Sequence, residues 1–167
     1  MKQELMEITE KNKYSTKDIA KWIRQTLKKD FPNCKFSVQT EYYSMGSSIH
    51  LTILQSDVRI IKKVSEITPE DILRLGNARN LSEEETIKML QEVFAKETYF
   101  QVNQYYIDSD WQFTPEGKNF LTKVLLIANK YNWDKSDSMI DYFDVNYYLH
   151  FNLGRYDKPF IDGGDRK

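Results

Sequence analysis

The first clear pattern in the chain is helical. Apolar side chains recur every three or four residues, and Asp18 follows Ser15 at the spacing of a capped helix start. We predict a helix over about Thr16–Asp30, ended by Pro32 and Asn33. Its apolar stripe comprises Ile19, Trp22, Ile23, Leu27 and Phe31.

Three later segments alternate between apolar and polar residues, which is typical of half-buried strands. The first covers 35–43 and the second 49–53, and the small residues of Ser44–Ser47 lie between them. This arrangement predicts a β-hairpin. The third segment, 145–153, predicts a closing strand with one apolar face. Two further segments, 58–61 and 99–107, are interpreted as extended chain.

Between the hairpin and the closing strand, the pattern becomes helical again. Thr68-Pro69 and Ser82 followed by Glu85 are helix-start signatures, so we predict a helical insertion over about 65–97. Thr114-Pro115 begins another helix, whose apolar residues indicate a core element.

No repeat or Pro/Gly/Ser-rich linker divides the chain, so residues 1–167 are expected to form one domain. We predict an α+β fold with an antiparallel sheet, in the order N-terminal helix, hairpin, helical insertion, helix and closing strand. Residues 161–167 contain two glycines and charged ends, and are expected to form a flexible tail.

Composition narrows the class of protein. With 40% hydrophobic residues in a chain of 167, a real core is expected. No apolar run approaches the roughly 20 residues that cross a bilayer, and the first residues lack the apolar stretch of a signal peptide. A cytoplasmic protein without membrane contact is therefore expected. The one cysteine, Cys34, has no partner for an intramolecular disulfide.

Charge is uneven along the chain, although the formal net charge is only −1. Between Lys17 and Lys35 there are six basic residues against two acidic ones, a balance of +4. The first helix places Lys17, Lys21, Arg24 and Lys28 away from its apolar stripe, so it is a candidate phosphate-contacting surface. Candidate contacts beside it are Lys35, Ser37, Gln39, Tyr42 and Tyr43. A solvated charged face is the alternative interpretation.

The only two histidines, His50 and His150, fall on the polar phase of their strands, with Ser48 near the first. If the strands are neighbours, two imidazoles on one sheet face form a candidate site for phosphate binding or acid–base chemistry. Ordinary surface histidines are the alternative. No third catalytic group is fixed by the sequence, so we assign no catalytic residue.

Four aspartates near the end of the chain are candidate metal ligands. Their spacing is not that of an EF-hand loop, and capping or turn roles are favoured. We therefore predict no metal site and no cofactor. The four are Asp134, Asp137, Asp141 and Asp144.

Two segments carry a resemblance to a known family. DIAKWIRQTLKKDFPNCKFSVQTEYYSMGSSIHLTIL resembles the opening of the large polyvalent protein-associated domain, type twenty-nine. NKYNWDKSDSMIDYFDVNYYLHFNLGRYDKPF is similar to that family's Asp-rich turn and closing strand. The helical insertion is a departure from the compact form of the family.

The resemblance implies a protein of a phage or a conjugative element, without implying a known reaction. Our leading hypothesis is a non-enzymatic binding module that has a protein partner and possible roles in countering host defence. Its expected contact surface is the basic first helix with the polar face of the hairpin. Nucleic-acid binding by the same surface is the alternative, and an unrecognised small enzyme using His50 or His150 is the second alternative.

Overall fold

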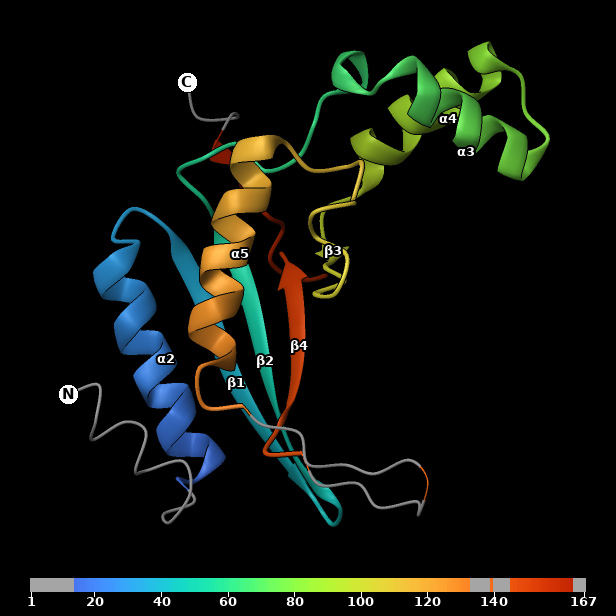
Figure 1. Cartoon of the computed structure of the whole chain (residues 1–167). Helices are drawn as coiled ribbons and strands as arrows, with labels where there is room; N and C mark the ends of the chain where they lie inside the picture. Colours follow the sequence, from blue (N-terminus) through green and yellow to red (C-terminus); the bar gives the residue numbers. More distant parts are fainter. Residues whose placement is uncertain (1–13, 133–138, 140–144, 164–167) are drawn as a thin grey trace.

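A computed structural model describes residues 14–132, 139 and 145–163 of the chain. It is an α+β fold in which two helices cover one face of a four-stranded sheet (Figure 1). The strands are β1 (Lys35–Tyr43), β2 (Gly46–Gln55), β3 (Phe100–Gln101) and β4 (Tyr148–Leu153). Their order in the sheet is β1-β2-β4-β3.

The first helix, α2, occupies Thr16–Asp30, as predicted. The Ser15 side chain accepts a hydrogen bond from the Asp18 N–H at 3.1 Å, which satisfies one of the free donors at the helix start. The second covering helix, α5, spans Pro115–Asn129 and is capped by Thr114. Both helices pack their apolar sides against the same face of the sheet (Figure 1).

The main core lies between this helical layer and the sheet. Central strand β2 contributes Ile49, Leu51 and Ile53, which are fully buried. Helix α2 contributes Ile23 and Leu27, also fully buried. Because alternate residues of a strand face opposite sides, this burial fixes which side chains point away from the helices.

The sheet is mostly antiparallel, as expected, but one pairing is not. The predicted hairpin is present, with β1 antiparallel to β2. Strand β4 lies beside β2 and runs parallel to it, with His50 paired to His150 in the register. A parallel neighbour requires a long crossover connection, and here that connection holds the helical segment and α5.

The two segments that were expected to be extended, 58–61 and 99–107, form little regular strand. In 58–61 only Ile61 forms a bridge, with Phe113. The N–H groups of Ile60 and Ile61 instead donate to the buried carboxylate of Asp162 at 2.7 and 2.8 Å. In 99–107 only Phe100–Gln101 is a strand, because the Asn103 side chain accepts from the Tyr105 N–H and begins a turn.

The closing strand starts three residues later than the predicted 145–153. Side-chain hydrogen bonds hold the preceding residues: the Asn146 amide donates to the Tyr131 carbonyl, and the Tyr147 N–H donates to the Asn132 side chain. At the other end, the predicted tail at 161–167 begins with anchored residues. The Ile161 N–H donates to the Leu54 carbonyl at 2.9 Å, while residues 164–167 lie outside the described part.

The predicted helical insertion contains two helices, α3 (Pro69–Arg79) and α4 (Glu83–Lys96), preceded by the short 3-10 helix η1 (Val64–Glu66). They form a second, smaller hydrophobic cluster around Ile67, Ile72 and Leu90. This helical pair lies beyond the end of the sheet and does not cover either face (Figure 1). None of the described helices combines the length and apolarity needed to cross a lipid bilayer.

Candidate functional site

The sheet face opposite α2 and α5 has no helix packed on it among the described residues (Figure 1). We call it the open face. It is made of polar and aromatic residues because each alternates with a core residue along its strand. Its residues are Ser37, Gln39, Glu41, Tyr43, Ser48, His50, Thr52, Gln101, Tyr148, His150 and Asn152.

The two histidines lie at the centre of the open face, which confirms that they share a face. Their rings stack with centroids 4.4 Å apart and planes at 12°. His50 Nε2 lies 3.2 Å from Ser48 Oγ and 3.2 Å from Glu41 Oε2. Burial and the neighbouring His50 lower the pKa of His150, while Glu41 acts in the opposite direction. His150 is therefore mainly uncharged at neutral pH, and the two stacked rings form an aromatic centre of the open face.

This cluster does not have the geometry of a catalytic triad. In a triad, the nucleophile and the acid contact different nitrogens of the histidine. Here Ser48 and Glu41 both approach the same atom, Nε2 of His50. Ser48 is also only 1% exposed, so its hydroxyl has little access to a substrate.

Metal-binding chemistry has little support in the described residues, which contain no group of three or more His, Cys, Asp or Glu side chains placed to hold an ion. The aspartates considered as ligands, Asp134, Asp137, Asp141 and Asp144, lie outside the described residues.

Two hollows border the histidine pair. One of about 600 Å³ runs along the edge of β1 and is lined from both sides of the strand, by Gln39, Glu41 and His50 on the open face and by Arg24, Val38 and Thr40 on the helix side. The other, of about 380 Å³, lies toward β3 and is lined by residues that include Gln101 and His150. The imidazoles therefore lie between a hollow at the β1 edge of the sheet and a hollow toward β3.

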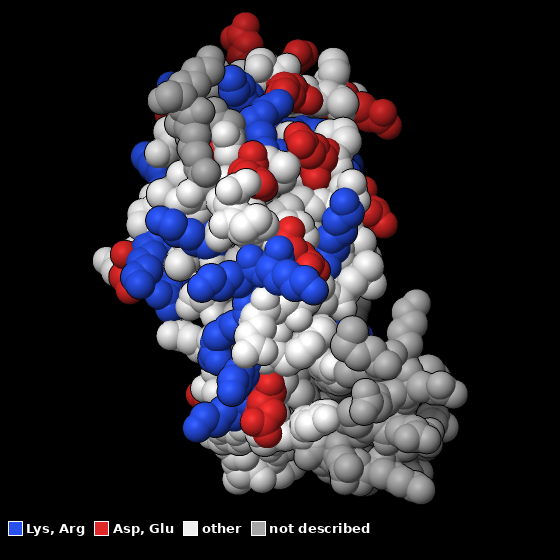
Figure 2. All heavy atoms as spheres, turned by 90° about the vertical axis from the view of Figure 1, so that its left-hand side faces the viewer, with Lys and Arg blue, Asp and Glu red and all other residues white. Residues whose placement is uncertain are grey.

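The predicted basic residues of α2 occupy a different surface. Lys17, Lys21 and Lys28 are exposed on the outer side of the helix. Figure 2 shows Lys and Arg side chains gathered in a band on this side of the molecule, with fewer acidic ones between them. The basic helix and the open face are thus on opposite sides of the edge strand β1.

Arg24 links these two surfaces, in a role that the sequence did not indicate. Its Nε and Nη2 atoms donate to the Val38 carbonyl at 3.0 and 2.6 Å. That carbonyl belongs to β1, the outermost strand. Arg24 therefore protects a sheet edge that would otherwise present a free acceptor to solvent or to another chain.

Tyr42 and Tyr43, which are adjacent in β1, lie on opposite sides of the sheet. Tyr42 lies on the helix side, and its hydroxyl accepts a hydrogen bond from the Lys17 N–H at 2.9 Å. Tyr43 lies on the open face, beside Gly46 at the hairpin tip. Tyr148, which was not among the predicted contacts, approaches the same glycine from β4. The polar phase of β4 was visible in the sequence, but its place beside β2 was not.

Lys35 is exposed at the start of β1, next to a register shift between Lys35 and Phe36. Of the predicted contacts, the structure thus brings Ser37, Gln39, Tyr43, Ser48 and the two histidines together on the open face. The others lie on the helix side or at the margin: Lys17, Lys21, Arg24, Lys28, Lys35 and Tyr42.

The comparisons with known proteins gave one family. The model described as large polyvalent protein associated domain 29 matches residues 14–114, more than half of the 167 residues. The match covers α2, the hairpin, α3 and α4, and it stops before α5 and β4. No curated protein and no solved structure matches the chain.

Proposed function

This chain belongs to the large polyvalent protein-associated domain family, type twenty-nine, and from that premise we propose that it is a protein-binding module whose contact surface is the open face. The observation that carries the proposal is the sheet face on which the described residues place no helix, with the stacked His50–His150 pair at its centre.

The chemistry of the open face suits a protein partner. Interface centres are depleted in charge and enriched in aromatic groups, with polar residues at the rim. The centre here holds two imidazoles, and Tyr43 and Tyr148 are 43% and 44% exposed. The charged residue Glu41 belongs to the edge strand β1, and its carboxylate contacts His50. Side chains of a partner would fill the two hollows beside the imidazoles.

We propose that the module comes from a phage or a conjugative element, as the family resemblance implies, and that its partner is a host protein whose defensive action it blocks. Blocking by binding requires a stable surface and no reaction. The absence of triad geometry around His50 is consistent with this role.

Replacing open-face residues with arginine tests the proposal. Gln39→Arg and Tyr148→Arg each place a long charged side chain on the face, and they should weaken a purified complex at least about tenfold through steric and desolvation costs. Thr122→Arg makes the same change on the exposed side of α5 and should leave binding unchanged. Isothermal titration calorimetry on a partner that co-purifies with the wild-type chain is the measurement. Equal affinity for all three variants would sink the proposal.

Nucleic-acid binding is the second candidate, and the basic band over α2 favours it. Fluorescence anisotropy with labelled single-stranded and duplex DNA and RNA should then show affinity that falls steeply as salt rises. Lys21→Glu and Lys28→Glu are the informative variants. Arg24→Glu is not, because it also removes the donors on the Val38 carbonyl. Absence of binding at low salt would exclude this candidate.

A further inference from the structure

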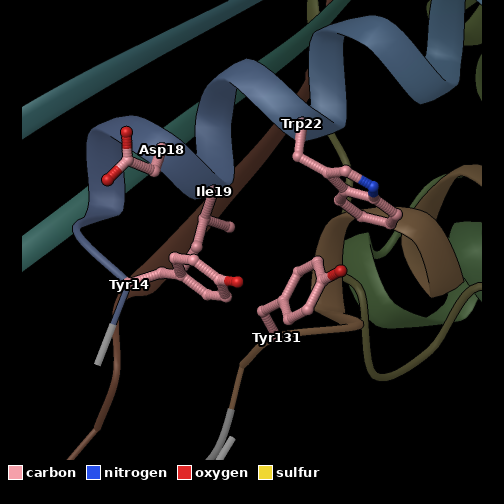
Figure 3. Close-up of a pocket in the computed structure, with 5 residues that line it drawn as sticks. All are labelled: Tyr14, Asp18, Ile19, Trp22 and Tyr131. Atoms are coloured by element: carbon pink, nitrogen blue, oxygen red, sulfur yellow. The ribbon is translucent and has the colours of Figure 1, made fainter. Parts of the chain in front are cut away.

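A pocket separate from the open face lies between the start of α2 and the end of α5 (Figure 3). It has a volume of about 270 Å³. Five described residues line it: Tyr14, Asp18, Ile19, Trp22 and Tyr131.

The aromatic rings of Tyr14, Trp22 and Tyr131 form the walls of the pocket. Trp22 and Tyr131 meet edge to face, with centroids 4.7 Å apart and planes at 85°. Tyr14 approaches Tyr131 in the same way, at 6.3 Å and 74°. Figure 3 shows the Tyr14 and Tyr131 rings on either side of the space, with Ile19 between Tyr14 and the helix. Because these rings meet edge to face and do not stack, part of their aromatic surface faces the pocket.

The walls favour a positive charge. The face of an aromatic ring is electron-rich and attracts a cation within about 6 Å of its centroid. The chain's own Lys130 shows this attraction, since its Nζ lies 5.0 Å from the Trp22 centroid and 6.0 Å from that of Tyr131. Asp18 also lines the pocket, and its carboxylate is turned away from the space between the rings (Figure 3). Three aromatic rings thus surround one small space, with an acid nearby on the first turn of α2.

We propose that this pocket binds a quaternary or methylated ammonium group. A simple ammonium is strongly hydrated and needs several acceptors in place of water. The one carboxylate among the lining residues, that of Asp18, is turned away from the rings and already accepts a hydrogen bond from Ser15 Oγ at 2.6 Å. A methylated ammonium carries its charge under an apolar surface, so it fits walls that are aromatic and aliphatic. Its source is either a free choline-like molecule or a methylated lysine of a protein.

Choline and its neutral isostere, 3,3-dimethylbutan-1-ol, test the proposal without altering the protein. Both have the same shape, so a hydrophobic pocket alone would bind them equally. We expect choline to bind about tenfold more tightly, because the cation–π attraction acts on the charge. The measurement is a two-dimensional NMR titration that follows the Trp22 indole N–H, assigned by its loss in Trp22→Phe. Equal affinities, or no shift of this signal with choline, would overturn the proposal.

Matched variants locate the site. Asp18→Asn should weaken choline binding several-fold, whereas Asp30→Asn, the same change at the other end of α2, should leave it unchanged. Lys130→Gln should strengthen binding, because it removes a competing cation from Trp22. Equal effects of the two aspartate variants would contradict the assignment of the site.

The source of the cation is settled by a second titration. A peptide containing trimethyllysine that binds more tightly than choline, while the unmodified peptide does not bind, identifies a protein ligand. Equal binding of choline and the trimethyllysine peptide identifies recognition of the headgroup alone. The pocket shares no residue with the open face, so either proposal can fail without the other.

Discussion

Arg24 has a different role in the structure from the one that the sequence indicates. In the sequence it is one cation of a basic helix, and in the fold its guanidinium binds the Val38 carbonyl on the edge strand. Arg24→Met keeps much of the aliphatic stem and removes both donors. We expect it to lower the free energy of unfolding by about 1–2 kcal/mol, measured by urea denaturation. Lys21→Met on the same helix should change it by less than about 0.5 kcal/mol. Equal losses would contradict the edge-protecting role.

His150 should make stability depend on pH. Its folded-state pKa is lowered from the ordinary 6.5, because burial and His50 disfavour the charged imidazole. The unfolded chain therefore binds more protons between the folded pKa and 6.5. Stability should fall as pH decreases through this window and should not respond to His150 above it. Urea denaturation across a pH series should show a shallower slope for His150→Gln, and an unchanged slope would refute the assignment. Gln39→Asn serves as the control.

At the level of single residues, the sequence predicted part of the candidate site on the open face. Alternation placed His50 and His150 on the polar phase of their strands, and the structure confirms a shared face. Their stacking depends on the register of β2 against β4, which pairs residues about one hundred positions apart. No local pattern determines such a register. The pocket at Trp22 was missed for the same reason, because Tyr131 reaches it from the end of another helix.

At the scale of elements, helix starts were the most predictable features, because the capping interactions are local. Ser82 and Glu85 form a capping box at the start of α4, as their spacing indicated. Strand limits were less predictable. The Asp162 carboxylate accepts hydrogen bonds from the N–H groups of Ile60 and Ile61. These N–H groups are therefore not available to pair with a strand, and the expected extension of the sheet does not form.

The capping box gives a prediction for α4. Ser82→Ala removes the acceptor for the Glu85 N–H and should lower the free energy of unfolding by about 1 kcal/mol. Ser44→Ala in the exposed hairpin turn is the control and should have little effect. Thermal and urea denaturation of the two variants are the measurements. A neutral Ser82→Ala would show that the helix start is stabilised by other contacts.

At the scale of the whole molecule, the helical pair α3 and α4 has its own small hydrophobic cluster, separate from the main core. Elements with fewer buried apolar contacts have a lower free energy of local unfolding. Hydrogen–deuterium exchange should therefore be faster in α3 and α4 than in α2 and β2. Matching protection in all four elements would indicate that the molecule opens as one cooperative unit.

The family match and the open face overlap only in part. The matched residues end at 114, so His50 lies within them and His150 lies beyond them. The central pair thus needs β4, which the chain places beside β2 after the helical segment and α5. The histidine pair of the open face therefore depends on β4 as well as on the hairpin.

The measurement that tests the central claim most directly is site-specific photocrosslinking in bacterial cells, where the proposed host partner would be present. A photoreactive amino acid is placed at Gln39 or Tyr148 on the open face, and at Gln25 or Thr122 on the outer sides of α2 and α5. We predict one defined protein adduct from the two open-face positions and none from the helix positions. Adducts that arise only from the helix positions, or equally from all four, would contradict the assignment of the open face as the contact surface.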